Sequence, residues 1–287
     1  MSHSNIVFAG RLDRAWLRLL TLGRSASGHY ARRSGFAKTL MAGVVERLAA
    51  PFKNTLSIYS RLGFELLLDR NSAVDAAMIR NGEWEPAQVA FLQQLTEVYR
   101  GGGESIFLDI GAYWGLYALT ARQTQIFNQI LAFESDGHNF AQLQSNLFLN
   151  RAAKEIRAFN NAVSDRNDVM HVMDSLGHPT GNRGGVGKVD KDCHLPTSQV
   201  VSVTIDSLLS CSDRNLAIKI DVEGHEQFVL AGMKRTVENN RIIMQVEIFE
   251  AQQAAVLPQL EALGLRHIHT IEHDFYYTNI DRDKLGF

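Results

Sequence analysis

The chain has 287 residues, of which 45% are hydrophobic, and a formal net charge of −2. This length suits one large globular domain, or one domain with a smaller attachment, and the near-neutral charge gives no overall signature of nucleic-acid binding. Two cysteines are too few for a disulfide framework. No apolar run approaches the roughly 18 residues of a membrane span, and the first ten residues lack the basic start of a secretory signal. We therefore expect a cytoplasmic enzyme.

Residues 1–60 are expected to form a basic helical extension, and residues 61–287 the main domain. Residues 11–53 carry nine Lys or Arg against two acidic residues, a net of +7, which leaves −9 for the rest of the chain. Leu12, Trp16 and Leu19 fall near one face of a helix. We interpret the extension as a solvated helix packed on the main domain. The alternative is a peripheral helix on the anionic inner surface of a membrane.

The main domain is expected to begin with a strand at 63–70 and two helices over 74–100. These helices break at Asn81-Gly82, and Pro86 lies near the start of the second. Gly101–Gly103 then form a hinge. Beyond the hinge, strands and helices alternate. The expected strands are 105–110, 129–135, 156–164, 216–224 and 241–249, and the expected helices are 114–123, 138–150, 225–239 and 251–264.

This alternation predicts an α/β fold with a doubly wound, mostly parallel seven-stranded sheet. The segments 266–271 and 274–280 are expected to add a C-terminal antiparallel hairpin. Residues 165–200 interrupt the alternation with five glycines among polar residues. We expect them to form an inserted loop or short strands over the C-terminal edge of the sheet, where ligands bind in such folds.

The strand at 105–110 leads into a candidate ligand site. Asp109 and Gly111 end this strand, Gly115 opens the next helix, and Glu134 ends the following strand 23 residues after Gly111. An acid about 20 residues downstream of such a turn is the usual partner of ribose hydroxyls. A nicotinamide dinucleotide needs G-x-G-x-x-G at the turn, but bulky Tyr113 replaces the second glycine. S-adenosylmethionine has no phosphate, and its cationic sulfonium suits a nearby acid. We therefore predict S-adenosylmethionine, with an NAD-dependent oxidoreductase as an alternative.

Several further motifs follow one another between Gly82 and Glu250. They are GEWEP (82–86), FLDIGAYWGLYAL (107–119), LAFES (131–135), NAVSD (161–165), VSVTIDSLL (201–209), IKIDVEGHEQFVLAGM (218–233) and VEIFE (246–250), with Asn139, Leu143 and Asn146 between them. With these motifs the chain resembles the FkbM-type family of S-adenosylmethionine-dependent methyltransferases, which have the Rossmann-like class I fold. The family usually has Asn where this chain has Tyr113, and the first 60 residues lie outside the resemblance.

The resemblance implies a set of cofactor-binding residues. Asp109, Gly111 and the backbone around Tyr113, in the turn that Gly115 closes, would hold the methionine portion. Glu134 would bind the ribose. The remaining implied residues are Ser135 beside the ribose, Ala162 and Val163 beside the adenine, and Glu85, which closes over the cofactor or else forms an acidic first helical turn beside Pro86.

The catalytic group is expected at the end of the strand 216–224. Lys219 and Asp221 share one face of this strand, and a buried Lys219 needs a carboxylate partner, either Asp221 or Glu247. Asp221 is the predicted catalytic or acceptor-orienting residue, and Glu247 on the next strand is a further catalytic candidate. His225 is a candidate base or, alternatively, a helix cap.

A divalent cation is a further alternative, bound by the residues that share this edge: Asp221, Glu223, His225 and Glu247. Cys193 and His194 follow no zinc-binding spacing, even with His171 and His178 included.

The acceptor follows from the resemblance, which implies hydroxyls of sugars in glycans or glycolipids, or of polyketide-type and other small natural products. We expect an O-methyltransferase that acts on a sugar hydroxyl in polysaccharide biosynthesis. A non-catalytic nucleoside-binding module is an alternative of another class. The charge of −9 outside the basic segment argues against a nucleic-acid acceptor. The oligomeric state is not predicted.

Overall fold

The computed structural model describes residues 55–177, 182–185, 187, 194 and 196–285. Its main sheet has five parallel strands and an antiparallel pair. The parallel strands are β3 (Ser105–Ile110), β4 (Gln129–Phe133), β5 (Ile156–Phe159), β9 (Asn215–Ile220) and β10 (Arg241–Glu247), and the antiparallel pair is β11 (Arg266–Ile271) and β12 (Asp274–Thr278). The strand order is β11-β12-β10-β9-β3-β4-β5. The predicted mostly parallel seven-stranded sheet with a C-terminal antiparallel hairpin is confirmed.

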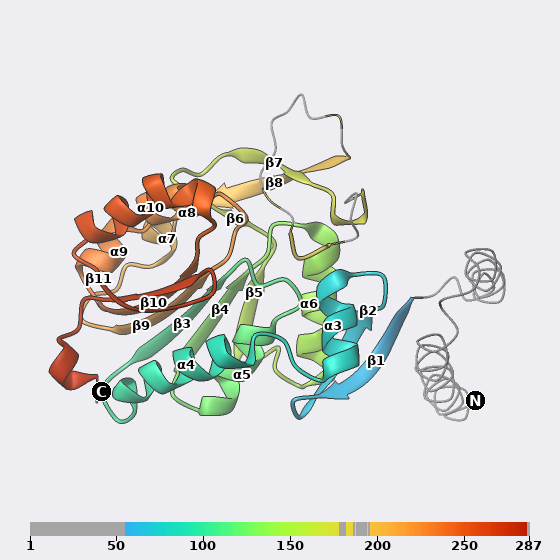
Figure 1. The fold of residues 1–287 in the computed structure, drawn as a ribbon, viewed down its shortest axis with the longest axis horizontal. Coiled ribbons are helices and arrows are strands. Elements are labelled where there is room, and N and C mark those ends of the chain that lie inside the picture. Colours follow the sequence, from blue (N-terminus) through green and yellow to red (C-terminus); the bar gives the residue numbers. More distant parts are fainter. Residues whose placement is uncertain (1–54, 178–181, 186, 188–193, 195, 286–287) are drawn as a thin grey trace, which may run out of the picture. The chain divides into compact units, whose positions relative to one another are not determined.

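Helices cover both faces of this sheet (Figure 1). On one face lie α4 (Pro86–Thr96), α5 (Leu116–Thr124) and α6 (Gly137–Leu149), with α3 (Ala73–Asn81) beside α6. On the other face lie α7 (Ile205–Leu208), α8 (Glu226–Ala231), α9 (Lys234–Glu238) and α10 (Glu250–Ala262). Short 3₁₀ turns occupy Glu97–Tyr99, Ser175–Gly177 and Arg282–Lys284. No helix among the described residues is long and apolar enough to cross a lipid bilayer.

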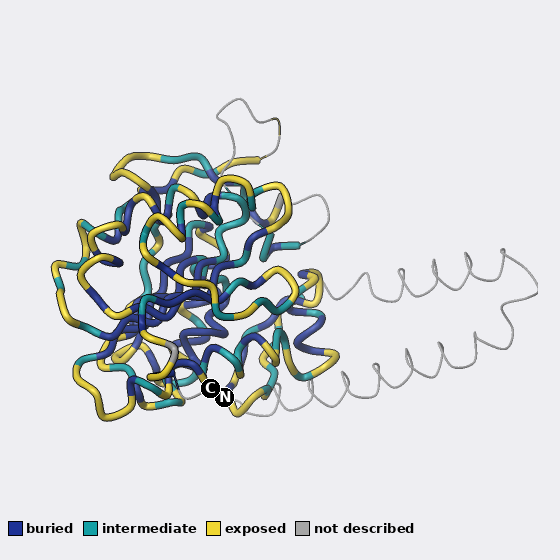
Figure 2. The backbone as a smooth tube through the Cα atoms, turned by 60° about the vertical axis from the view of Figure 1, so that its left-hand side comes forward, coloured by how far each residue is buried: buried dark blue, intermediate teal, exposed yellow. Residues whose placement is uncertain are grey.

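The alternation of side chains along the parallel strands divides the interior into two cores. Phe107 of β3 packs with the helices α4 and α5, whereas the next residue, Leu108, packs with α8 and α10. Every residue of β3 and of β9 is buried, as Figure 2 shows by the dark strands at the centre. Continuous apolar strands of this kind are typical of parallel sheets covered on both faces.

The prediction of helix was wrong for residues 56–60. They belong to β1 (Leu56–Arg61), which pairs antiparallel with β2 (Phe64–Asp69) through a turn at Leu62-Gly63. Both turn residues have positive φ, +53° and +81°, and glycine adopts this conformation at little cost. Alternate residues of β2 are buried, so the period is that of a strand. The rest of the predicted basic helical extension, residues 1–54, lies outside the described residues.

The outer edge of β2 is bound by side-chain amides of α6. Asn146 Oδ1 accepts from the Leu67 N–H at 2.7 Å, and Gln142 Nε2 donates to the Leu67 carbonyl at 2.9 Å. One turn further along α6, Asn150 both accepts from the N–H of Glu65 and donates to its carbonyl. The three amides repeat every four residues, so they share one side of the helix.

Two other predicted elements are interrupted. The expected strand 156–164 breaks at Asn160, whose side chain donates to the carbonyls of Glu134 and Ser135. The strand that follows, β6 (Ala162–Val163), belongs to a separate sheet with β8 (Thr197–Val203) and β7 (Val169–Met173). The expected helix 225–239 divides into α8 and α9 at Gly232, where a Cβ atom would lie 1.9 Å from the Ser164 carbonyl oxygen.

Candidate active site

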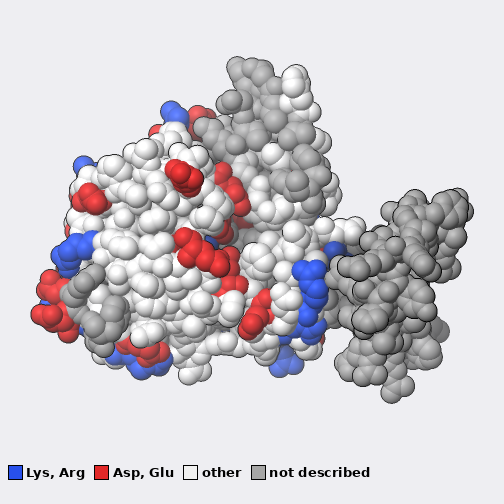
Figure 3. Space-filling model, in the orientation of Figure 1, with Lys and Arg blue, Asp and Glu red and all other residues white. Residues whose placement is uncertain are grey.

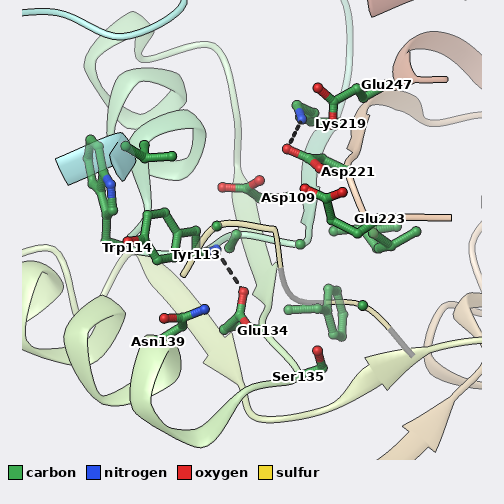
Figure 4. Close-up of a pocket in the computed structure, with 18 of the residues that line it drawn as sticks. Asp109, Tyr113, Trp114, Glu134, Ser135, Asn139, Lys219, Asp221, Glu223 and Glu247 are labelled. Atoms are coloured by element: carbon green, nitrogen blue, oxygen red, sulfur yellow. Dashed lines mark hydrogen bonds and ion pairs between the residues drawn. The ribbon is translucent and has the colours of Figure 1, made fainter. Parts of the chain in front are cut away.

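A cavity of about 490 Å³ opens beyond the C-terminal ends of the parallel strands, with Gly184 and Gly187 of the inserted segment in its wall. This volume lies in the range of small-molecule sites. The predicted site residues that line the cavity are Glu85, Asp109, Gly111, Tyr113, Glu134, Ser135, Ala162, Val163, Asp221, His225 and Glu247. Gly115 does not line it. Figure 4 shows two groups of side chains, one around Glu134 and the other around Asp221.

The glycines of the turn serve packing. Gly111 has φ +87°, and a Cβ atom there would lie 1.7 Å from the Asp221 carbonyl oxygen. Gly115 has φ +96°, and its Cβ would lie 2.6 Å from Leu143. The Gly111 and Ala112 N–H groups both donate to the Phe133 carbonyl at 2.9 Å. The turn after β3 is therefore fixed by its neighbours, with Gly111 at the cavity and Gly115 packed against α6.

Tyr113 links this turn to α3. Its backbone N–H donates to Glu134 Oε2 at 2.8 Å, and its hydroxyl donates to Asp75 Oδ1 and contacts Ser72 Oγ, both at 2.6 Å. Asp75 also accepts from the Asp69 N–H and from Gln142. Burial nevertheless raises the pKa of the Asp75 carboxyl. Asp75 and Tyr113 are 38 residues apart, so no local sequence pattern predicts this contact.

The Tyr113 hydroxyl can be tested by its removal. We expect Tyr113→Phe to lower the free energy of unfolding by about 1–3 kcal/mol, because the buried Asp75 loses a hydrogen-bond donor. Urea denaturation measures this change, and Tyr59→Phe is the matched control, since the Tyr59 hydroxyl accepts an exposed bond from Arg70. Equal losses in the two variants would contradict the importance of the buried bond.

Glu134 lies buried at the end of β4 with both carboxylate oxygens engaged. Oε2 accepts from the Tyr113 N–H and Oε1 from the Asp136 N–H, each at 2.8 Å. Burial raises the pKa of this carboxyl to about 7, although the two N–H groups favour the charged form. Each oxygen of a carboxylate has a second lone pair, so Glu134 can still accept hydroxyl donors from a ligand.

Lys219 occupies the opposite end of the cavity. Its side chain is 2% exposed, and Nζ lies 2.8 Å from Asp221 Oδ2. Nζ also lies 5.1 Å from the centre of the Tyr117 ring, a cation–π distance. Burial alone would lower the pKa of the ammonium group, but Asp221 and other surrounding carboxylates raise it above its usual value. The prediction that a buried Lys219 has a carboxylate partner is confirmed.

Asp221 and Glu247 form a carboxyl–carboxylate pair. Burial and the adjacent charge of Asp221 raise the pKa of Glu247 to about 10. Burial also acts to raise the pKa of Asp221, but Lys219 and the hydrogen bond with Glu247 lower it below its usual value. The opposite directions of these two shifts favour a proton on Glu247, shared with the Asp221 anion in the hydrogen bond between them.

The predicted cation-binding residues are only partly brought together. Carboxylate oxygens of Asp221, Glu223 and Glu247 lie within 4.8 Å of one another. The Lys219 ammonium already supplies a positive charge to Asp221, so a second cation there would meet repulsion. Cation binding thus stays an alternative.

His225 is not part of this carboxylate group, and its side chain contacts Ser164. Its Nε2 lies 2.9 Å from Ser164 Oγ, and its ring stacks on Phe228 at 4.6 Å. His225 is the N-cap residue of α8, where its carbonyl accepts from the Phe228 and Val229 N–H groups, but its side chain makes no capping bond. The imidazole is buried and forms part of the cavity wall, and its role as a base stays a prediction.

Glu85 closes the cavity from the loop between α3 and α4. It has φ +49°, an uncommon conformation for a residue with a side chain. Its oxygens accept from Trp84 Nε1 and from the Tyr117 hydroxyl, both at 2.8 Å. Burial raises its pKa in spite of the nearby Lys219. Glu85 is thus an element of the cavity wall rather than only an acidic first turn of α4.

The chain is similar in structure to the methyltransferase FkbM from Methylobacillus flagellatus, with 16% identity over 71% of this chain and 60% of that chain, and a TM-score of 0.41. It is also similar to M. jannaschii TYW2 in complex with AdoMet (11% identity, 79% of this chain, 84% of that chain, TM-score 0.38). A third similar structure is an rRNA methylase from Streptococcus thermophilus (10% identity, 66% of this chain, 92% of that chain, TM-score 0.41).

The chain thus spans 60% of the length of the first of these proteins. No curated protein sequence matches the chain. Residues 109–267 match the family model of the methyltransferase FkbM domain. The match begins at Asp109, includes Glu134 and Asp221, and covers more than half of the 287 residues. The chain therefore belongs to the FkbM methyltransferase family.

Proposed function

We propose that the protein is an S-adenosylmethionine-dependent O-methyltransferase that acts on a sugar hydroxyl in a glycan or glycolipid. The observation that carries the proposal is one cavity with two chemically distinct ends, the first around Glu134 and the second around Asp221. When bound, S-adenosylmethionine supplies a methyl group on a positively charged sulfur.

The residues at the first end fit this cofactor. Glu134 has lone pairs for the two ribose hydroxyls, and Ser135 lies beside it. Ala162 and Val163 line the cavity together with Met170 and Val172 of β7, an apolar wall that suits the faces of an adenine ring. Figure 3 shows acidic side chains around a hollow in the surface of the molecule. The negative potential of these side chains favours a cationic cofactor over the pyrophosphate of a dinucleotide.

The residues at the second end suit a hydroxyl acceptor. Asp221 is 28% exposed, so its carboxylate can accept a hydrogen bond from the acceptor and then the proton that the hydroxyl releases. An ion pair with Lys219 and a hydrogen bond with Glu247 fix the position of this carboxylate. Trp84 and Phe249 also line the cavity. They exclude water and give a sugar ring aromatic surface to pack against.

The sugar acceptor is the finer part of the proposal. A cavity edge rich in carboxylates favours a ligand with several hydroxyl donors, which a sugar supplies. We further propose a place in polysaccharide biosynthesis, with the basic N-terminal segment bringing the enzyme to a membrane that carries the acceptor. A small natural product with a comparable hydroxyl remains the second acceptor class, to be separated from sugars by screening.

The cofactor assignment is tested by Glu134→Ala. We expect the affinity for S-adenosylhomocysteine, measured by calorimetry, to fall by roughly 10- to 100-fold, because charge-assisted hydrogen bonds to the ribose are lost. Glu134→Gln, which keeps one acceptor oxygen, should lose less. Glu261→Ala, an exposed residue of α10, is the control, and NAD is the comparison ligand. Preferential binding of NAD, or unchanged affinity in Glu134→Ala, would count against the proposal.

A further inference from the structure

Arg80 lies in the last turn of α3 and lines the cavity. No sequence pattern marked it as a site residue. We infer that its guanidinium binds the carboxylate at the amino-acid end of the cofactor. The inference rests on the proposed use of S-adenosylmethionine and adds a specificity residue to that site. It follows from the position of α3, from the side chains that this helix presents to the cavity, and from the distribution of charge around the cavity.

The two ends of α3 are tied to either side of the glycine turn. At its start, Ser72 and Asp75 bond the Tyr113 hydroxyl. Just beyond its end, Glu85 bonds the hydroxyl of Tyr117 in the first turn of α5. The helix therefore passes across the turn between β3 and α5. The amino-acid end of the cofactor is expected at this turn, beside Asp109 and Gly111.

The side of α3 that faces the cavity leaves room for a ligand. Ala73, Val74, Ala77 and Arg80 line the cavity, and their spacing of three or four residues places them on one side of the helix. Small residues precede Arg80 on this side. Arg80 lies about 7.5 Å along the axis from Asp75, at 1.5 Å per residue, and so beyond the point where Tyr113 is attached.

The charges around the cavity leave Arg80 as the available cation. Among the described residues, the acidic side chains that line the cavity are Glu85, Asp109, Glu134, Asp221, Glu223 and Glu247. The Lys and Arg residues in the same described set are Lys219 and Arg80. Lys219 is buried and bound to Asp221. Arg80 is exposed and makes no hydrogen bond or ion pair with any residue that the structure describes.

The carboxylate of a ligand needs a cationic partner in so acidic a cavity. Beside six carboxyl-bearing side chains, the carboxylate of an amino acid would be repelled unless a cation neutralised it. The planar guanidinium offers two parallel N–H groups that match the two carboxylate oxygens. The same chemistry suits an acidic group on the acceptor, so the experiment must separate the two.

The test compares two ligands that differ at the amino-acid end. S-adenosylhomocysteine carries the carboxylate, whereas 5′-methylthioadenosine keeps the nucleoside and lacks the amino acid. We expect Arg80→Gln to weaken calorimetric binding of S-adenosylhomocysteine about tenfold and to leave the affinity for 5′-methylthioadenosine unchanged. Arg80→Lys should recover part of the loss. Arg151→Gln, at an exposed arginine outside the cavity, should change neither affinity.

The outcomes separate this inference from the function on which it rests. Selective loss of S-adenosylhomocysteine binding in Arg80→Gln supports the inference. Equal affinity of wild-type and Arg80→Gln protein for S-adenosylhomocysteine overturns it while the cofactor assignment stands, and would point to an acidic acceptor instead. Equal weakening of both ligands also overturns it, because α3 would then have moved. Failure of the wild-type protein to bind S-adenosylhomocysteine overturns the proposed function and this inference together.

Discussion

Replacing Asp221 with asparagine is expected to slow methyl transfer at least about 100-fold, the lower range for the loss of a general base. Asparagine retains a hydrogen-bonding oxygen for the acceptor but cannot take up its proton. The fold should tolerate the change. Once Asp221 is neutral, the pKa of Glu247 falls, because its adjacent negative charge has gone, and Glu247 becomes the partner of Lys219. Binding of S-adenosylhomocysteine should therefore remain close to that of the wild-type protein.

Initial rates of methyl transfer to an acceptor found by screening measure this effect. Glu247→Gln is the matched variant, because the raised pKa of Glu247 favours its protonated form and glutamine can donate the same hydrogen bond to Asp221. It should lose much less activity than Asp221→Asn. Asp283→Asn, at an exposed position, controls for the loss of an acid elsewhere. Full turnover in Asp221→Asn, with normal cofactor binding, would show that the catalytic assignment is wrong.

Replacing Lys219 with methionine is expected to cost about 3–5 kcal/mol of folding free energy, the range for breaking a buried ion pair. The Lys219 side chain is 2% exposed and paired with Asp221, and the charges of Asp274, Glu85 and Glu247 also raise the pKa of its ammonium group. Methionine fills a similar volume but leaves these carboxylates without their cation. Denaturant unfolding measures the loss. Lys234→Met, at a side chain that is 65% exposed, should stay within about 0.5 kcal/mol of wild type.

The Lys219→Met deficit should also depend on pH. In the wild-type protein the folded-state pKa of Asp221 is lowered, so this group contributes stability above its unfolded pKa of about 3.9. In the variant its folded-state pKa is raised, so the group costs stability as pH rises above that value. The difference between the two proteins should therefore be small near pH 4 and large at neutral pH. Adding Asp221→Asn to Lys219→Met should recover part of the loss. A deficit independent of pH would contradict this account.

The sequence predicted those parts of the site that depend on local pattern. Asp221 directly follows β9 and lies two residues after Lys219, so their shared face followed from the period of the predicted strand. Asp109 and Glu134 end neighbouring parallel strands, which places them at the same edge of the sheet. Residues close together in the chain determine where a strand ends and which of its side chains share a face.

The parts that the sequence did not reveal depend on contacts between distant segments. The bond of Tyr113 to Asp75 joins residues 38 positions apart. The break at Gly232 results from contact with the Ser164 backbone. Arg80 has the pattern of an ordinary solvated helix residue, and only the position of α3 places it at the cavity. The strand β1 was missed because six alternating residues carry little signal beside a basic segment that suggested helix.

The amides of α6 along β2 also bear on how the protein behaves in a crowded solution. A strand with a free edge can recruit a strand from another molecule, which is a common start of aggregation. Here Gln142, Asn146 and Asn150 already occupy the hydrogen-bonding groups of Leu67 and Glu65 on the outer edge of β2. While α6 is folded, self-association along this edge is blocked by side chains that act as a substitute strand. The helix α6 thus completes the hydrogen bonding of β2 and also protects this edge against aggregation.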